Sequence, residues 1–205
     1  MMFESKFVLQ TFEKSGLHAG MFQQVRNAFA VVEYKQTCGQ TIVCQKKNNW
    51  GNHAESEMID FLETVLETES LCSQNINFFV NFSPCFECSG HIIRFLKDAK
   101  TKYKVALKMT IIFSHLYKIQ RPSCVDGSHL KHHRLPDDAA HDRNLKGLRK
   151  LARAGIALRP FRQTDWRELG RLLQVIPFRH GQYKNNGRKD EDDILLEDFE
   201  SLCIM

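Results

Sequence analysis

Four residues of this sequence combine types and spacings that suit metal-assisted hydrolysis. His53 and Glu55 stand two positions apart, and Cys85 and Cys88 form a Cys-x-x-Cys pair directly after Pro84. One imidazole and two thiolates are good ligands for Zn²⁺, and they leave its fourth position to a water molecule. Because the metal lowers the pKa of that water toward about 7, these residues predict a zinc-activated hydroxide at neutral pH.

Glu55 is the residue that we expect to move protons in this site. It is too close to His53 in sequence to share its helix face, but at a first helical turn it can project into the same cavity. There it would take a proton from the zinc water, protonate the ring nitrogen of a nucleobase and assist the loss of ammonia. The pattern H-x-E with P-C-x-x-C is typical of zinc-dependent nucleobase deaminases. The alternative is a structural zinc site, which usually has four protein ligands instead of three and an acid.

Both halves of the pattern fall where a helix is expected to begin. Residues 54–68 place apolar side chains at helical spacing, so His53 and Glu55 stand at the start of an amphipathic helix. A strand expected over 76–82 stops at Ser83-Pro84, and the cysteine pair opens a helix that runs to about Lys100. Helix N-termini also favour the thiolate forms that bind metal.

The elements that must position these helices form an α/β pattern. The order is helix, hairpin, and then helices alternating with strands, which predicts a five-stranded mixed sheet flanked by about six helices. No period holds from Ser114 to His141, and Gly155 is a plausible helix cap. The further helices are expected at 2–14, 145–154 and 164–176, and the further strands at 28–34, 41–44, 105–113 and 156–161.

Composition predicts one domain and a polyanionic partner. With 205 residues, 42% of them hydrophobic, the chain can build one core, which we place at 1–180. No apolar run is long enough to cross a membrane, so no membrane partner is expected. Residues 186–205 carry two basic and seven acidic side chains, which leaves a net charge of +10 on the rest. A basic body favours a polyanion, although ordinary charge scatter would give the same total.

The C-terminal residues 181–205 have a different composition. Residues 181–193 are rich in Gly, Lys, Asn and acidic residues and predict a flexible linker. The segment that follows resembles a leucine-rich nuclear export signal, which predicts docking into the groove of a nuclear export receptor and shuttling between nucleus and cytoplasm. The alternative is a tail helix packed on its own domain. The apolar residues of this segment are Leu196, Phe199, Leu202 and Ile204.

Beyond the zinc pattern, the sequence resembles the AID/APOBEC family of polynucleotide cytidine deaminases over roughly residues 20–178. The similar segments are 109–117 (MTIIFSHLY) and 147–161 (GLRKLARAGIALRPF), the latter followed by Trp166. The resemblance implies a cytidine-deaminase-like fold and hydrolysis of cytosine to uracil in single-stranded DNA, with Zn²⁺ as cofactor. An RNA substrate, a free-nucleoside deaminase and a catalytically silent member that binds nucleic acid or a partner remain alternatives.

The same resemblance implies which residues would contact substrate. Asn48 fits the loop asparagine that touches the target nucleotide, and Tyr117 fits the aromatic that stacks near the base. Phe82 stands where the family normally has a tryptophan, with Ser83 next to it in the same motif, and Asn27 is similar to a first-loop residue near the target. The alternatives are a turn role for Asn48 and core roles for the two aromatic residues.

Two groups of residues keep an open interpretation. The stretch 118–143 is longer than the family's specificity loop, and its ligand-type residues could bind a second metal or nucleic acid, or only belong to a mobile loop. These residues are Cys124, His129, His132, His133 and His141. The second group is either a phosphate track or a solvated surface. It consists of Lys46, Lys47, Lys118, Arg121, Arg149, Lys150 and Arg153.

Overall fold

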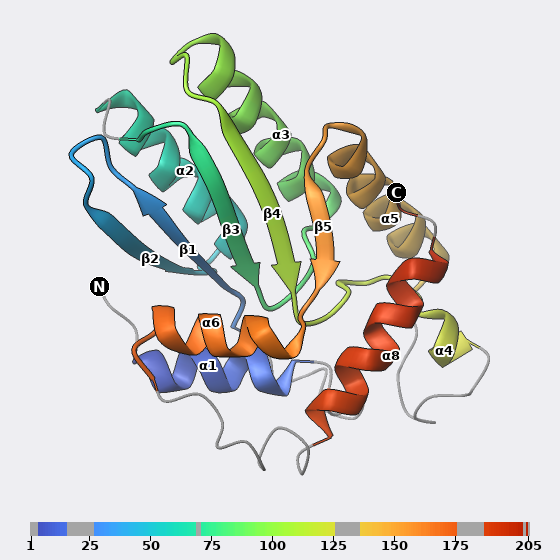
Figure 1. Cartoon of the computed structure of the whole chain (residues 1–205). Helices are drawn as coiled ribbons and strands as arrows, with labels where there is room; N and C mark the ends of the chain where they lie inside the picture. Colours follow the sequence, from blue (N-terminus) through green and yellow to red (C-terminus); the bar gives the residue numbers. More distant parts are fainter. Residues whose placement is uncertain are drawn as a thin grey trace.

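The chain folds around a five-stranded mixed sheet (Figure 1). The computed structural model describes residues 4–15, 27–68, 71–125, 136–175, 187–202 and 204. The strand order is β2-β1-β3-β4-β5, with β1 antiparallel to both neighbours and β3, β4 and β5 parallel to one another. The strands are β1 (Phe29–Lys35), β2 (Thr41–Lys47), β3 (Gln74–Val80), β4 (Leu107–Phe113) and β5 (Ala157–Pro160).

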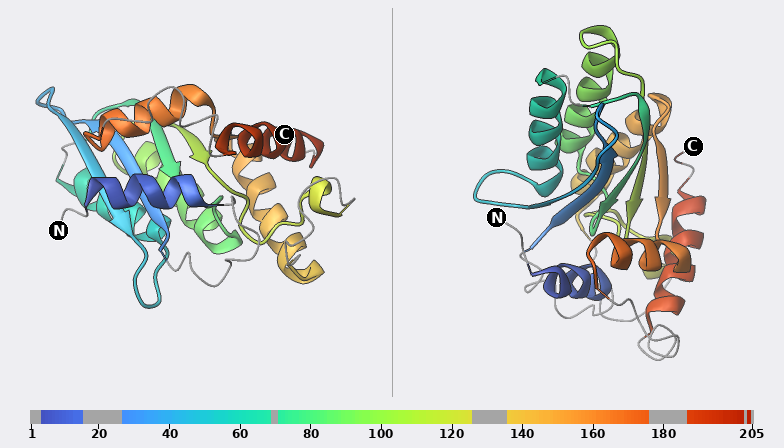
Figure 2. Two further views of the ribbon diagram at one scale, coloured as in Figure 1. Left: turned by 90° about the horizontal axis from the view of Figure 1, so that it is seen from below. Right: turned by 60° about the vertical axis from the view of Figure 1, so that its left-hand side comes forward.

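Helices cover both faces of this sheet, so the predicted α/β fold is confirmed. On one face, α2, α3 and α5 bury residues such as Met58, Phe95 and Leu148 against the strands. On the other face, α1 and α6 bury Phe12 and Trp166 (Figure 2). The bounds of these helices are α1 (Ser5–Lys14), α2 (Ala54–Glu67), α3 (Phe86–Thr101), α5 (Asp138–Arg153) and α6 (Gln163–Leu172).

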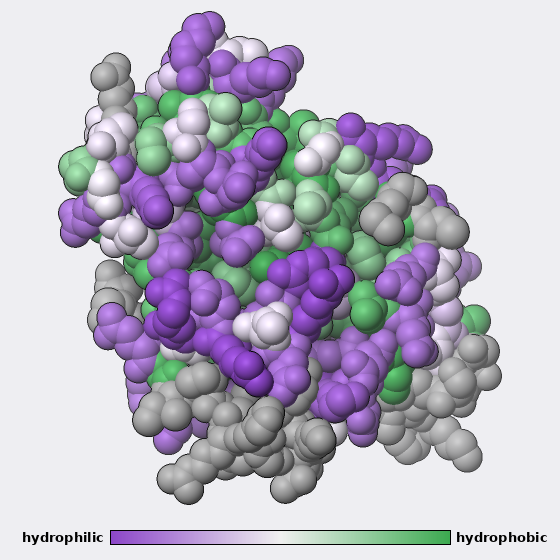
Figure 3. Space-filling view, viewed as in Figure 1, coloured by the Kyte–Doolittle hydropathy of each residue, from purple (hydrophilic) through white to green (hydrophobic). Residues whose placement is uncertain are grey.

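The apolar pattern of the strands explains this two-sided core. In β3, Phe78 packs with the α2 and α3 layer while its neighbour Phe79 packs with the α1 and α6 layer. Successive strand residues point to opposite faces, so a strand buried on both sides must be apolar at consecutive positions. Figure 3 shows hydrophilic side chains over α1 and α6, in keeping with helices whose apolar sides face the sheet.

One end of the sheet collects the connections that carry the candidate site. The carboxyl ends of the parallel strands β3 and β4 lie together there. Because β1 is antiparallel to β3, its first residue Phe29 lies at the same end and pairs with Lys47, the last residue of β2. The segments 48–53, 81–85 and 114–121 therefore meet at this end, in the lower half of Figure 1.

Most predicted elements are present, although several boundaries differ, since β2 continues to Lys47 instead of 44 and α6 ends at Leu172 instead of 176. Two further differences have a clear reason. Helix α5 begins at Asp138 instead of 145. Its first two turns carry no apolar period, so the spacing of apolar residues predicts only the later part of this helix. Asp137 caps it by accepting a hydrogen bond of 2.8 Å from the backbone N–H of Ala140. Strand β3 ends at Val80 instead of 82, since the Asn81 side chain takes over the hydrogen bond to Phe29 N–H, at 2.8 Å.

The C-terminal residues differ most from expectation. Residues 188–193 are not a flexible linker, because they open helix α8 (Arg188–Ser201), which lies beside β5 and the short helix α4 (Pro122–Val125). Phe199 is buried with its ring centroid 5.3 Å from that of Phe113, and Ile204 is buried as well. The tail thus packs on its own domain, and an export receptor could reach these two side chains only after α8 leaves it.

Buried ion pairs join α8 to the domain. We call Arg121, Arg188 and the α8 carboxylates Glu191, Asp192 and Asp198 the arginine cluster. Arg121 binds Glu191 and donates to Asp198 at 2.6 Å, although it was a candidate for a phosphate track; it is only 3% exposed. Arg188 donates to Asp192 and to the carbonyl oxygens of Ser15 and Ser114. These residues hold α8 in place and are unavailable to a nucleic acid.

None of the helices in the described ranges is long and apolar enough to cross a bilayer.

Candidate active site

His53, Cys85 and Cys88 come together as the sequence predicts. His53 Nδ1 lies 3.2 Å from Cys88 Sγ and 3.4 Å from Cys85 Sγ, and the three ligand atoms are all within 4.8 Å of one another. Tetrahedral zinc, with bonds of about 2.3 Å to sulfur and 2.0–2.1 Å to nitrogen, separates such ligands by roughly 3.6 Å. A slight opening of the three side chains would therefore seat the ion, and the donor set suits zinc.

Two helix starts position these ligands. His53 is the residue before α2, and Cys85 is the residue before α3, where its sulfur accepts from the backbone N–H of Cys88 at 3.5 Å. Ser56, one turn into α2, places its hydroxyl oxygen 3.7 Å from Cys88 Sγ. Because helix N-termini carry positive partial charge, this placement favours the thiolates that bind a cation.

The two thiols share one hydrogen bond and respond to it in opposite ways. The hydrogen bond from Cys88, with help from its backbone N–H, lowers the pKa of Cys85 to about 6, against the effect of burial. The same contact, together with burial, raises the pKa of Cys88 above its usual range. The free protein therefore favours one thiolate at neutral pH, and binding of zinc to both sulfurs must release the remaining thiol proton.

Glu55 lies beside this cluster with its carboxyl group out of the water. It is 6% exposed, and among the described residues no arginine or lysine forms an ion pair with it. Burial raises the pKa of Glu55 to about 7, while its own backbone N–H and His53 oppose that shift. A bound cation would favour the carboxylate and pull this pKa down again. A carboxyl group with these properties can both accept and donate a proton near neutral pH.

An aromatic wall adjoins the metal ligands. The ring of Tyr117 lies edge-on to His53, with 6.3 Å between centroids, and to Phe82, with 6.2 Å. Phe82 also contacts the ring of His115 at 6.0 Å. Ser83 is buried and positions the backbone that carries these rings. Its hydroxyl accepts from the Tyr117 backbone N–H at 2.9 Å, and its backbone N–H donates to the carbonyl of His115. Tyr117 and Phe82 are only partly buried, so their faces remain available to a ligand.

Asn48 and Asn27 lie at the same end of the sheet, where they hold the backbone. The Asn48 side-chain oxygen accepts from the Ala28 backbone N–H at 2.7 Å, and the backbone N–H of Asn48 donates to the Ala28 carbonyl. The carbonyl of Asn27 accepts from the Asn81 side chain at 3.2 Å. Asn48 therefore continues the pairing of β1 and β2 by one residue, and contact of Asn48 or Asn27 with substrate stays a prediction.

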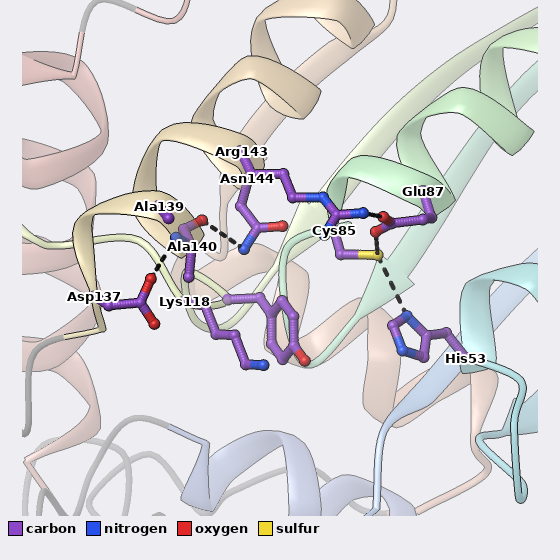
Figure 4. A pocket seen from close by; sticks show the side chains of 10 residues that line it. His53, Cys85, Glu87, Lys118, Asp137, Ala139, Ala140, Arg143 and Asn144 are labelled. Atoms are coloured by element: carbon purple, nitrogen blue, oxygen red, sulfur yellow. Dashed lines mark hydrogen bonds and ion pairs between the residues drawn. The ribbon is translucent and has the colours of Figure 1, made fainter.

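A pocket of about 440 Å³ opens next to the metal ligands (Figure 4). His53, Cys85 and Tyr117 line one side, and the first turns of α5 line the other. Glu87 links the two sides, because its carboxylate lies 3.4 Å from the Cys85 sulfur and forms an ion pair with Arg143. The remaining lining residues are Lys118, Asp137, Ala139, Ala140 and Asn144.

Asn144 and Gly147 support the site and were not singled out as site residues from the sequence. Asn144 of α5 accepts from the backbone N–H of Phe86, at 3.2 Å, where α3 begins. One turn later, a Cβ on Gly147 would lie 2.8 Å from the Phe86 Cα and 3.0 Å from Ser89 Oγ. Only glycine lets α5 come this close to the helix start that carries the cysteines. A glycine inside an amphipathic helix pattern was the available signal.

The remaining candidate metal ligands and basic residues lie in different surroundings. Cys124 and His141 belong to no group of three metal-type ligands among the described residues, and His141 Nδ1 accepts from Gln120 N–H at 3.1 Å. His129, His132 and His133 lie outside the described residues. Lys118 is exposed beside the pocket with its Nζ 5.3 Å from the Tyr117 ring centroid.

Three of the other basic candidates contact neighbouring groups. Lys46 Nζ lies 4.7 Å from the ring centroid of Phe61, and Lys150 Nζ lies 4.2 Å from that of Phe86. Arg149 is partly buried and donates to the carbonyl of Leu202. A phosphate track over the remaining basic residues stays a prediction.

Comparisons with known proteins identify a family that matches this chain. A family model described as APOBEC3, cytosine deaminase domain, matches residues 3–132. No curated protein matches the chain. One similar solved structure is a mutant of NE0047 in complex with 8-azaguanine, with 11% identity and a TM-score of 0.38, covering 83% of this chain and 82% of that one. Another is dCMP deaminase from the cyanophage S-TIM5 in complex with dCMP and dUMP, with 16% identity, a TM-score of 0.35, and coverage of 78% and 99%.

Proposed function

Since the chain belongs to the APOBEC3 cytosine deaminase domain family, we propose that it hydrolyses cytosine to uracil in single-stranded DNA. The observation that carries this proposal is the cluster of His53, Cys85 and Cys88 with the buried carboxyl group of Glu55 beside it. This domain uses zinc, and the three ligands form a site that suits it. Zinc bound there supplies a hydroxide nucleophile for attack on the carbon that carries the amino group.

The side chains around the metal ligands account for the rest of the reaction. Glu55 takes one proton from the attacking water and delivers it to the ring nitrogen of cytosine. It then takes the second proton from the new hydroxyl group as the carbonyl forms, and donates it to the amino group, which leaves as ammonia. Water and cytosine thus give uracil and ammonia, and Glu55 returns to its starting state. Tyr117 and Phe82 offer ring faces and edges that can pack against the base and exclude water from it.

Three features favour a base presented by a polynucleotide. The pocket beside the ligands is open to one side, where it is bounded by the exposed Lys118 and by the beginning of α5. A base that enters an open site leaves its sugar and phosphates outside, where Lys118 can meet them. The net charge of +5 also favours a polyanionic substrate. A single strand supplies an unpaired base without the cost of unstacking a duplex.

The test is a uracil assay on four substrates with the zinc-loaded protein. We expect uracil in a single-stranded DNA oligonucleotide, and less or none in the matched duplex, in single-stranded RNA and in free cytidine. Removal of zinc with a chelator should abolish the activity, and added zinc should restore it. A zinc-loaded protein that leaves single-stranded DNA unchanged would overturn the proposal, and a preference for RNA or cytidine would reassign the substrate.

A further inference from the structure

Trp50 is the most exposed large apolar side chain among the described residues. It is fully in solvent, whereas the other exposed examples, Phe7, Val43 and Val125, show between 37% and 59% of their surface. Burying a large aromatic side chain stabilises a fold, and this protein does not gain that stabilisation at Trp50. An indole left wholly in water is a candidate contact for a ligand.

The turn that carries Trp50 is held in one shape. The side-chain amides of Asn49 and Asn52, on either side of it, both donate to Oε1 of Glu57, at 2.7 and 2.8 Å. The Asn49 N–H also donates to the carbonyl of Asn52 at 3.1 Å. Gly51 has a φ of +97°, a conformation that other residues rarely adopt. These contacts fix the backbone on both sides of the indole, so its position is built into the fold.

This turn lies next to the metal ligands. It belongs to the connection between β2 and α2, which stands out from the body in both views of Figure 2. Trp50 precedes the ligand His53 by three residues, and three residues span at most roughly 10 Å. Stacked bases repeat every 3.4 Å along a strand, so the indole lies within a few nucleotides of a base placed at the metal. It is absent from the pocket lining, so it does not contact the target base itself.

We propose that Trp50 stacks on a base of the same strand as the target cytosine, a few nucleotides away, and so adds a second contact for single-stranded nucleic acid. This inference rests on the proposed function, because it takes the strand to run from the metal site. An exposed ring can stack on any base, so the contact adds affinity with little sequence preference. A free nucleoside would gain nothing from it.

Charge favours a nucleic acid over a protein as the occupant. Lys46 and Lys47 end β2 immediately before this connection, and Lys118 lies across the site beside Tyr117. Glu57, in the first turn of α2, has its carboxylate engaged by the two asparagine amides of the Trp50 turn. An exposed aromatic ring on a connection that follows two lysines suits a single-stranded nucleic acid, which combines stacked bases with a charged backbone. A protein pocket for Trp50 would not require them.

Tryptophan fluorescence tests this contact without relying on turnover. The chain has two tryptophans, and Trp166 is 1% exposed with its indole N–H bonded to Asp192, so an added oligonucleotide reaches only Trp50. The zinc-loaded Glu55→Gln protein is titrated with single-stranded DNA of about 12 nucleotides. We expect quenching that disappears in Trp50→Phe, and binding weakened roughly 5- to 100-fold by Trp50→Ala.

The controls separate stacking from a general loss of affinity. Trp50→Phe keeps a ring and should retain most of the binding, and Val43→Ala, which removes an exposed apolar side chain of β2, should leave it unchanged. Uracil formation by the wild-type protein, with no quenching and no effect of Trp50→Ala, would overturn the stacking contact and leave the proposed function intact. Quenching and weakened binding without any uracil would support the contact and remove the proposed function.

Discussion

Two of the regions that bury carboxyl groups in the described structure do so in different ways. In the arginine cluster, Glu191 and Asp198 of α8 are buried against Arg121, and each has a cation within hydrogen-bonding distance. In the metal site, Glu55 is buried with no arginine or lysine paired to it among the described residues. The first carboxyl groups have a guanidinium beside them, whereas burial raises the pKa of Glu55 to about 7.

The difference shows how the surroundings of a carboxyl group decide its role. An acid that is hydrogen-bonded to a guanidinium forms an ion pair that joins two parts of the fold. An acid buried without such a partner, next to metal ligands, is near the balance between its two protonation states and can exchange a proton with a substrate. Mutations in the two regions should therefore have different consequences, for catalysis in one and for stability in the other. Four variants test this comparison.

The largest effect is expected from Glu55→Gln. The amide keeps the shape of the side chain but cannot shuttle a proton, so the rate of uracil formation should fall by about 10²–10⁴-fold or more. Zinc content, measured by mass spectrometry, should be unchanged, because Glu55 is not a ligand. The melting temperature should stay level or rise, since an uncompensated buried carboxyl group is removed. A variant that deaminates at the wild-type rate would refute the role assigned to Glu55.

Arg121→Met should have the opposite profile. It leaves Glu191 and Asp198 buried without their cation, which should lower the free energy of unfolding by about 3–5 kcal/mol. Urea unfolding followed by circular dichroism measures this loss. A cost below about 1 kcal/mol would mean that α8 does not depend on these pairs, and the contrast between the two regions would fail.

Gly147→Ala connects the fold to the metal site. The added methyl group would meet the Phe86 backbone at 2.8 Å, so α5 must move away from the helix start that carries Cys85. Overpacking of this kind costs about 1–3 kcal/mol. We also expect weaker zinc binding, measured by competition with a chromogenic chelator. As a matched control, Gly90→Ala places a Cβ in open space on α3 and should leave both stability and zinc affinity near wild type.

The smallest effect is expected from Arg143→Met. Arg143 forms an ion pair with Glu87, as Arg121 does with Glu191, but both partners are more than half exposed. Exposed pairs contribute about 0–1 kcal/mol, so urea unfolding should barely change. If this variant cost as much as Arg121→Met, burial would not be what separates the two kinds of pair.

The zinc ligands could be predicted from sequence because their pattern is local. His53, Cys85 and Cys88 each stand at a helix start, and helix starts follow from apolar spacing and from Pro84. Their chemistry depends on residue type and spacing, both of which the sequence contains. The sheet was predictable for a similar reason, since its central strands are apolar at consecutive positions.

The position of α8 could not be predicted in this way. Glu191, Asp192 and Asp198 are buried, although charged side chains are usually exposed and the helix has no distinct apolar stripe. Their burial depends on Arg121 and Arg188, and the pairing of Arg121 with α8 is a long-range contact that no local period records. For the same reason, the sequence does not reveal that Arg121, a candidate phosphate contact, is buried in ion pairs.

The distance along the chain between these partners has a consequence for synthesis. Arg121 is separated from Glu191 by 70 residues and from Asp198 by 77. During translation, chains fold as residues emerge, and Arg121 has no α8 carboxylate to bind until about 70 further residues have been made. The ion pairs of Arg121 therefore form later than the contacts of its neighbour segment with β3 and β4. A ribosome-bound chain would carry all three metal ligands long before Arg121 can pair with Glu191 and Asp198.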